Sequence, residues 1–450
     1  MSGPIPVADE PVVSRWARLR RWMRPGTGIK RWLLVMFLGM TLLATAGALA
    51  IRMAFREVPA DSLAGQAFEL VSLNFLPDMA RPVVVIGLGV AIIGWGLWRL
   101  LAALLEPFPA RRGPLVELVY QKRSLARGPR IVAIGGGTGL STLLRGLKEV
   151  SSNITAVVTV ADDGGSSGKL RDELGIAPVG DIRNCMAALA DAEPAMASLM
   201  QYRFPVHDAV PGVAGHAFGN LLIAAMADIA GDFEEGVRLS NRVLAVRGQV
   251  VPVAPQALNL HAELADGTSL EGQSRIMRSR GIRRVWISPA RVEASVEAVE
   301  AIRGADLVVM GPGSLYTSLL PSLLVPGIRS ALESTAGLRV YVCNVATQPG
   351  ETEDYTLAEH VAALFAHDVG HLADAVLAND DLDARVPDAY PARPVRVDLP
   401  ADGLRPRVVL AGVVDRSNAH RHDPRRLTAA LVRLLDERPA VRPVAHASSA

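Results

Sequence analysis

The stretch that most constrains the fold of this chain is IVAIGGGTGL, residues 131–140. A short apolar run leads directly into four glycines, interrupted only by Thr138. The next residues, STLLRGLKEV (141–150), have the spacing of a helix. Glycines at a strand-to-helix turn let the backbone approach phosphate oxygens, and the helix N-terminus adds free N–H donors. The stretch therefore predicts a parallel α/β sheet with a phosphate-binding turn.

The chain after Arg130 alternates short apolar runs with amphipathic ones. Predicted strands are 154–160, 283–288, 306–310, 338–344 and 405–412, and predicted helices are 141–150, 220–230, 233–246, 295–304 and 423–437. This alternation predicts a doubly wound, Rossmann-like α/β fold with a parallel sheet. Residues of about 250–288 are richer in strand signals, with a hairpin signal at Asp266–Gly267, and predict a small β-rich insertion.

Composition excludes two classes of protein. Half of the 450 residues are hydrophobic, which is too many for a disordered chain. The net charge of +2 provides no global basic field, so we expect no nucleic-acid partner. The two cysteines, Cys185 and Cys343, cannot form a disulfide framework and are interpreted as small packing residues.

Two apolar runs near the N-terminus predict a membrane hairpin. Residues 32–51 carry no charge, and a second run covers about 83–105 with Arg99 inside it. A span needs about 20 apolar residues. Basic residues flank the pair, so the positive-inside rule predicts a multi-pass protein of the cytoplasmic (inner) membrane, with both termini and the main domain in the cytoplasm. A signal peptide is the rival interpretation of the first run. The predicted domains are a basic segment 1–31, a transmembrane hairpin 32–105, a basic linker 106–129, an α/β domain 130–437 and a flexible tail 438–450.

Polar residues follow the predicted strands at several points. They are expected to meet because ligands bind beyond the carboxyl ends of parallel strands. Acids and hydroxyls suit ribose and sugar, and amides suit a sugar or a base edge. The candidate ligand-binding residues are Gly135, Gly136, Gly137, Thr138, Gly139, Asp162, Asp163, Gly165, Ser166, Ser167, Asp181, Asn184, His216, Asn220, Gly311, Gly313, Ser314, Asn344, Thr347 and Gln348. Asp181 is also a candidate N-cap, and Arg183 a candidate phosphate partner.

The glycine loop does not match either common nucleotide motif. The dinucleotide fingerprint would need glycine where Leu140 or Thr142 stands, which disfavours an NAD(P)-dependent oxidoreductase. The later segment GGSSGKL (164–170) suggests a P-loop, but Asp163 replaces its first glycine and Leu170 its Ser or Thr. A nucleotide kinase or ATPase is therefore not expected.

Six motifs in order resemble one superfamily, the relatives of 2-phospho-L-lactate transferase, and more narrowly the YvcK-type gluconeogenesis factors. They are IGGGTGLSTLLRGLK, VTVADDGGSSGKLRDELG, PVGDIRNC, GHAFGNLL, GPGSLYTSLLP and CNVATQPGET. The resemblance covers about residues 130–437. The first two motifs are shared with the transferase branch, and the last two point to the YvcK-type branch.

The resemblance implies a protein that binds UDP-N-acetylglucosamine or a related UDP-sugar and regulates cell-wall (peptidoglycan) synthesis and cell shape during gluconeogenic growth. It implies a binder with no established reaction, a homodimer and a partner in envelope synthesis. Carried over, Gly136–Gly139 would hold the diphosphate, Asp162 would lie near ribose or sugar hydroxyls, and Asn220, Ser314, Asn344 and Thr347 would line the rest of the pocket. The membrane hairpin departs from the shorter cytosolic members. The alternative is a phospho-acid transferase, in which Asp162, Asp163 and Asp181 hold Mg²⁺.

Two further clusters are interpreted as having no function. His367 and His371 are four residues apart but lack a third metal ligand, and they are expected to be surface histidines. Asn379, Asp380, Asp381 and Asp383 lack the glycine and closing glutamate of a calcium loop, and a solvated loop is expected there.

Overall fold

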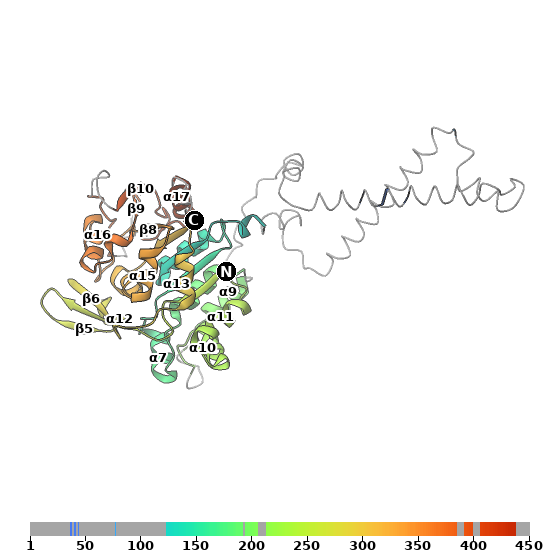
Figure 1. The fold of residues 1–450 in the computed structure, drawn as a ribbon. Helices are drawn as coiled ribbons and strands as arrows, with labels where there is room; N and C mark the ends of the chain where they lie inside the picture. The colour runs from blue at the N-terminus through green and yellow to red at the C-terminus, as the bar shows by residue number, and fades with distance from the viewer. Residues whose placement is uncertain are drawn as a thin grey trace, which may run out of the picture. The chain divides into compact units, whose positions relative to one another are not determined.

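The computed structural model describes residues 123–191, 194–205, 213–384, 391–398 and 406–437, together with Phe37, Met40, Thr41, Ala44 and Pro77. The chain divides into two units, Met1–Tyr120 and Gln121–Ala450. The fold described below is that of the second unit, which carries the labelled elements of Figure 1.

A sheet of seven parallel strands forms the centre of this unit (Figure 1). In spatial order the strands are β10 (Arg407–Ala411), β9 (Ala375–Asn379), β8 (Leu338–Val342), β7 (Leu307–Met310), β1 (Ile131–Gly135), β2 (Ile154–Val158) and β3 (Gln249–Pro252). Every neighbouring pair is parallel. β1, β2, β7 and β9 are buried along their whole length, which explains why they appear in the sequence as unbroken apolar runs.

The strand order reverses direction beside β1. From β1 the chain proceeds outward through β2 to β3, then returns to the other side of β1 and continues from β7 to β10. In a doubly wound sheet the connections on the two sides of such a point leave opposite faces, which opens a crevice at the carboxyl ends of the two central strands. The crevice between β1 and β7 is therefore where a ligand is expected in a fold of this kind.

Helices cover both faces of the sheet. On one face α6 packs against both α8 and α17, and α13 and α15 pack together in the crossovers of the other half. The helices are α6 (Gly137–Leu147), α7 (Gly165–Leu174), α8 (Gly180–Leu189), α9 (Pro194–Gln201), α10 (Phe218–Ala230), α11 (Phe233–Val243), α12 (Gln273–Ile276), α13 (Val296–Arg303), η1 (Leu315–Leu319), α14 (Leu320–Leu323), α15 (Pro326–Ser334), α16 (Leu357–Ala366), η2 (Gly370–Leu372) and α17 (Pro424–Asp436). Helix α16 begins with a full capping box in which the Thr356 and Glu359 side chains bond each other's backbone N–H.

A second, antiparallel sheet has the order β5 (Ser269–Glu271), β4 (Asn259–Leu264), β6 (Ile282–Ser288). The tight turn between β4 and β5 is at Asp266–Gly267, where Gly267 has φ +84°. The run 283–288 belongs to this small sheet, within the predicted insertion of about 250–288. Residues 249–252, at the start of that range, differ from the prediction because they form β3 at the edge of the main sheet. Strand β9 was not predicted.

The predicted membrane hairpin is contradicted. A span needs about 20 consecutive apolar residues in one helix. No helix within the described residues is long and apolar enough to cross a bilayer, and α10 and α17, with 13 residues each, are the longest described. The predicted multi-pass localisation is therefore not supported. The two predicted spans, 32–51 and 83–105, lie outside the described residues except for Phe37, Met40, Thr41 and Ala44, and so do 1–31 and the tail 438–450.

Candidate functional site

A polar cavity of about 200 Å³ lies at the switch point of the sheet. Its walls come from the turns after β1, β7 and β8 and from the loop that precedes α17. The lining residues are Gly136, Gly137, Thr138, Gly139, Thr142, Pro312, Gly313, Ser314, Asn344, Val345, Ala346, Thr347, Gln348, Pro349, His420, Arg421 and His422. Nine of the candidate ligand-binding residues thus line one cavity, although they come from three separate segments of the sequence.

The glycines of the first turn bring α6 close to the neighbouring loop. A Cβ at Gly139 would lie 2.5 Å from the carbonyl oxygen of Pro312, so only glycine fits there. Gly137 has φ +67°, with open space beside its Cα. The N-terminus of this 11-residue helix therefore faces the cavity, and its N-cap residue, Gly136, has no side chain to cap it. Its first-turn N–H groups and the positive end of its dipole suit an anion.

Asn344 fixes the opposite wall. Its side-chain Nδ2 donates to the carbonyl of Gly313 at 3.0 Å, and its Oδ1 accepts from the N–H of Gly313 at 3.3 Å. Beside this pair, the Gln348 Nε2 donates to the Ser314 hydroxyl at 2.7 Å. The loops after β7 and β8 are therefore joined by side-chain hydrogen bonds, and both present amide and hydroxyl groups to the cavity.

The C-terminal loop completes the cavity and was missed by sequence reasoning. His422 is buried, and its Nε2 lies 3.1 Å from the carbonyl of Cys343 at the end of β8. Burial lowers the pKa of His422 to about 4, so the ring is neutral at pH 7 and donates this hydrogen bond. The anchored loop places the exposed Arg421 guanidinium at the cavity. The only signal in the sequence was the triplet HRH at 420–422, which lies outside all six motifs.

A second group of candidates lies beside the cavity, at the end of β2 and the start of α8. Asp181 does not cap α8, because the N-cap is Val179. Its carboxylate instead accepts a hydrogen bond from the N–H of Gly137. Burial and the charge of Asp162 raise the pKa of Asp181 to about 6, against the effect of Gly137 and Arg183. Burial also raises the pKa of Asp162.

Arg183 is the cation of this group. It is 8% exposed, and its Nη2 donates to Asn184 at 3.0 Å. Burial, and then the charge of Arg203, lower the pKa of Arg183, while Asp181 and Asp162 oppose that shift. Two acids and a buried arginine thus share one polar region next to the glycine turn.

Ser166, His216 and Asn220 form a buried hydrogen-bonded cluster. The Ser166 hydroxyl accepts from Asn220 Nδ2 at 3.0 Å and lies 3.1 Å from His216 Nδ1. Ser167 is also buried. Gly165 starts α7 with φ +50°. Gly135 ends β1 and Gly311 follows β7, and both also have a positive φ. None of these residues lines the cavity described above.

Glu351 is a buried acid that the sequence analysis did not single out. It is 2% exposed, and no lysine or arginine within the described residues forms an ion pair with it. Burial raises its pKa to about 7, opposed by interactions with Thr317 and with Ser314 of the cavity wall. A buried carboxyl group with no ion-pair partner among the described residues therefore lies next to Ser314 in the cavity wall.

Asp162 and Asp163, two of the three acids considered for Mg²⁺, already hold backbone groups. Asp162 Oδ1 accepts from the N–H of Gly164 at 2.9 Å, and Asp163 Oδ1 from that of Ser274 at 2.8 Å. Within the described ranges, no three His, Cys, Asp or Glu side chains gather in a way that could hold a metal ion. A metal here would need donors from a bound phosphate as well.

Two side chains, His367 and Asn379, differ from the environments expected for them. His367 is buried, not on the surface, because its Nε2 accepts from the N–H of Val285 at 2.9 Å and ties β6 to α16. Asn379 is also buried, and its Oδ1 accepts from the N–H groups of Val413 and Val414. Cys185 and Cys343 are buried free thiols.

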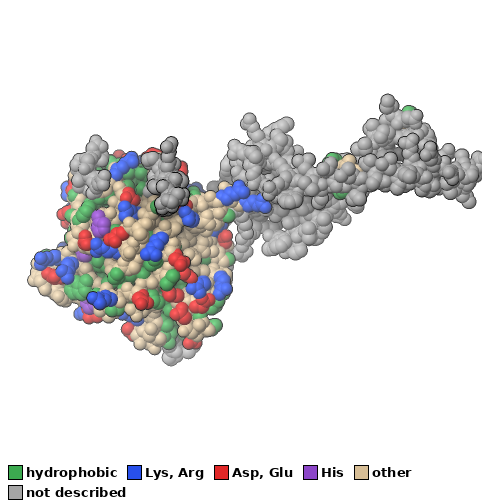
Figure 2. Space-filling view, in the orientation of Figure 1, with side chains coloured by type: hydrophobic (Ala, Val, Ile, Leu, Met, Phe, Trp, Pro, Cys, Tyr) green, Lys and Arg blue, Asp and Glu red, His purple; other side chains and the backbone are tan. Residues whose placement is uncertain are grey.

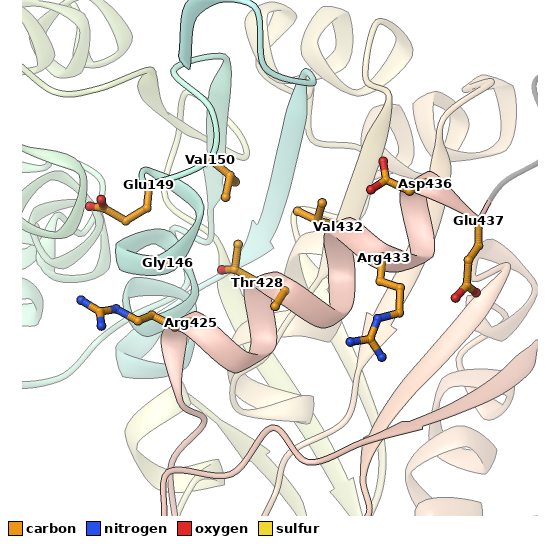
Figure 3. Close-up of a pocket in the computed structure, with 10 residues that line it drawn as sticks. Gly146, Glu149, Val150, Arg425, Thr428, Val432, Arg433, Asp436 and Glu437 are labelled. Atoms are coloured by element: carbon orange, nitrogen blue, oxygen red, sulfur yellow. The ribbon is translucent and has the colours of Figure 1, made fainter. Parts of the chain in front are cut away.

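A larger hollow of about 600 Å³ lies between α6 and α17 (Figure 3). Arg425 and Arg433 of α17 and Glu149 beyond α6 surround Val150 and Val432 there. It contains no glycine turn, and charges of both signs line it. We therefore assign the ligand to the smaller cavity at the switch point.

Known proteins share this architecture and sequence. A relative from Nostoc sp. (strain PCC 7120) is 45% identical over 436 residues, which cover 94% of this chain and 93% of that protein. The gluconeogenesis factor of Bacillus subtilis (strain 168) is 46% identical over 322 residues, 70% of this chain and all of that protein. A crystal structure of a UPF0052-family protein from Bacillus halodurans is 42% identical, has a TM-score of 0.63, and matches over 68% of this chain and 99% of its own. The family model described as 2-phospho-L-lactate transferase CofD matches residues 131–411. The chain belongs to the CofD/UPF0052 family and is a homologue of the gluconeogenesis factors.

Proposed function

We propose that this protein binds a nucleotide sugar, UDP-N-acetylglucosamine or a close relative, and regulates cell-wall synthesis and cell shape during growth on gluconeogenic carbon sources. The observation that carries the proposal is the cavity at the β1/β7 switch point. One wall is a bare helix N-terminus, and the other is a set of amides and hydroxyls. The name of the Bacillus subtilis relative supports the link to gluconeogenesis.

The diphosphate of the ligand would bind at the N–H groups of Thr138 and Gly139, with Arg421 as its cationic partner. Thr347 and Gln348 would then face a sugar or a base edge. The cavity is smaller than the about 300–1,000 Å³ typical of ligand pockets. The rest of the ligand would therefore extend past Asp181 toward Asp162, whose carboxylate can accept sugar hydroxyls.

A transferase is the second candidate, since Asp162, Asp181 and Arg183 lie beside the glycine turn. Acids with raised pKa values next to a phosphate site are frequent in catalytic centres. A bound Mg²⁺ would supply charge neutralisation between phosphate and acceptor. In that case the protein would move a phospho-acid group from a nucleotide diphosphate donor.

Titration calorimetry separates the two candidates. UDP-N-acetylglucosamine, UDP-glucose, GDP and NAD are compared with and without Mg²⁺, and the ligand mass is measured after overnight incubation. The proposal predicts selective binding of a UDP-sugar that is recovered intact. A preference for GDP with metal, or a cleaved ligand, would establish the transferase instead. No binding of any nucleotide would refute both.

The regulatory part of the proposal requires a protein partner in envelope synthesis, and a homodimer remains a prediction for the assembly. The calorimetry described above tests the ligand assignment separately from both.

A further inference from the structure

Five arginines lie within ten residues of the chain, from the short helix α12 to strand β6 of the small antiparallel sheet. We call Arg275, Arg278, Arg280, Arg283 and Arg284 the arginine cluster. All five are exposed, and residues 273–292 contain no Asp or Glu. In Figure 2, Lys and Arg side chains gather at the end of the molecule where Figure 1 places this sheet.

The local fold presents these side chains to solvent. The register between β4 and β6 shifts beside Arg284, so that Arg283 and Arg284 are both exposed although they are adjacent in a strand. Arg283 pairs with Glu263 at 3.0 Å, and Arg280 with Glu353 at 2.7 Å. The other three, Arg275, Arg278 and Arg284, form no ion pair with a carboxylate in the part of the chain that the structure describes.

We infer that the arginine cluster is a docking surface for an acidic segment of a partner protein. Planar guanidinium groups bind carboxylates through two parallel hydrogen bonds, and three of the five are available for this. The unpaired arginines lie among paired ones, with Glu263 on the same sheet. Such an arrangement fits acidic side chains that are spaced to meet the unpaired arginines better than it fits a polymer that carries a negative charge at every unit.

Nucleic acid fits this surface less well. Residues 123–450 carry 33 Lys and Arg against 37 Asp and Glu, so the domain has no excess of basic residues to follow a long phosphate backbone beyond the cluster. The one tryptophan of the sheet, Trp286, is already stacked on His261, with ring centroids 5.5 Å apart, and Arg284 lies 5.6 Å from its ring. That leaves little free ring surface for a nucleic-acid base or for insertion into lipid.

The segment that carries the arginine cluster also contacts two loops of the ligand region. The Ser274 N–H bonds Asp163, and Gly350 of the loop after β8 packs against the backbone of Met277 and Arg278. A docked partner would therefore contact the segment that supports the site. This link to the ligand rests on the proposed function, whereas the docking surface does not.

The test measures fluorescence anisotropy of a fluorescein-labelled dodecapeptide in which Glu alternates with Ser, with the full chain at 50 mM NaCl. The double variant Arg278→Glu/Arg284→Glu should bind at least about tenfold more weakly than the wild type. The matched control Arg303→Glu/Arg433→Glu changes the net charge equally at exposed arginines elsewhere and should stay within about twofold. Both variants must unfold at the same temperature as the wild type. If Arg278→Glu/Arg284→Glu does not, the charge-neutralising variant Arg278→Gln/Arg284→Gln is used in its place.

Three results would overturn the inference. The first is that the wild type binds no peptide, and the second is that both double variants lose peptide binding equally. The third is that poly(U) RNA or phosphatidylglycerol vesicles bind the wild type more tightly than the peptide does, and that Arg278→Glu/Arg284→Glu loses this binding. Because none of these assays contains a nucleotide, their failure would leave the ligand assignment untouched, and calorimetry tests that separately.

Discussion

At the scale of single residues, the account depends on how side chains hold the backbone around the cavity. Asn344 illustrates this, because its amide bonds both the N–H and the C=O of Gly313. The residue type was predicted from its position after an apolar strand. Its partner was not, because Gly313 lies 31 positions away and only the parallel pairing of β7 with β8 brings the two together.

Asn344→Ala should weaken nucleotide-sugar binding by at least about tenfold and lower the free energy of unfolding by about 1–2 kcal/mol, because two hydrogen bonds are lost. Calorimetry and denaturant unfolding measure the two effects. Asn241→Ala is the matched control, since Asn241 bonds the N–H and C=O of Val250 in the same way, away from the cavity. An equal loss of affinity in both variants would remove Asn344 from the site.

Glu351→Gln should make the protein more stable above neutral pH. Burial raises the pKa of Glu351 from 4.5 to about 7, so the folded state binds its proton more tightly than the unfolded chain does. Stability is therefore lost as the pH rises from about 4.5 to about 7, and the whole cost remains above that range.

The glutamine variant avoids this cost. Its free energy of unfolding should exceed that of the wild type by about 1–3 kcal/mol at pH 8, and the difference should disappear near pH 4.5. Urea unfolding at the two pH values measures it, with the exposed Glu300→Gln as control. A difference that does not depend on pH would show that Glu351 does not titrate in this range.

At the scale of elements, the site is an assembly of loops and one helix N-terminus. The glycine turn could be predicted, because a short apolar run followed by glycines and an amphipathic run specifies a strand, a turn and a helix. The loop of residues 412–423 could not, because nothing local in it indicates a ligand. Its place depends on long-range bonds, those of His422 to β8 and of Asn379 to Val413 and Val414.

Gly139→Ala should separate α6 from the loop after β7. The new Cβ would meet the Pro312 carbonyl, a backbone group that cannot rotate away. We expect a loss of about 1–3 kcal/mol in stability from overpacking and a loss of ligand binding. Gly231→Ala is the control, because that residue ends α10 at φ +70° with open space beside it, and it should cost about 1 kcal/mol without affecting the ligand. Wild-type affinity in Gly139→Ala would contradict the close approach.

Arg421→Ala should weaken ligand binding by about 10–100-fold and change stability by less than about 0.5 kcal/mol, since the side chain is exposed. Calorimetry measures the affinity, and Arg421→Lys should restore part of it. Arg425→Ala, four residues later and in the hollow between α6 and α17, should bind normally. If both alanine variants bind as the wild type does, the C-terminal loop does not hold the phosphates.

At the scale of the whole molecule, strand order gives the site its location. The alternation of strands and helices predicted the sheet. The order reversal beside β1 then brings the glycine turn after β1 next to the loop after β7, because Ile131 pairs in register with Leu307, 176 residues later in the sequence. Strand β9 was not predicted, and residues 249–252 were placed at the edge of the insertion although they form β3, since a short apolar run has the same pattern in either sheet. The membrane prediction is not supported, because no helix within the described residues is long and apolar enough to cross a bilayer.

The polar residues after β2 were predicted for the same site, and the structure places them beside the cavity. Asp181 links the two regions through the N–H of Gly137. The arrangement is that of a phosphate site with an adjoining polar region, which is what a nucleotide sugar with a diphosphate in its middle requires.

The measurement that tests the central claim most directly is a crystal structure of the protein with UDP-N-acetylglucosamine. The account predicts the diphosphate at the N–H groups of Thr138 and Gly139, within reach of Arg421, with the loop after β8 against one end of the ligand. A ligand bound between α6 and α17, or an empty β1/β7 crevice at a saturating concentration, would contradict it.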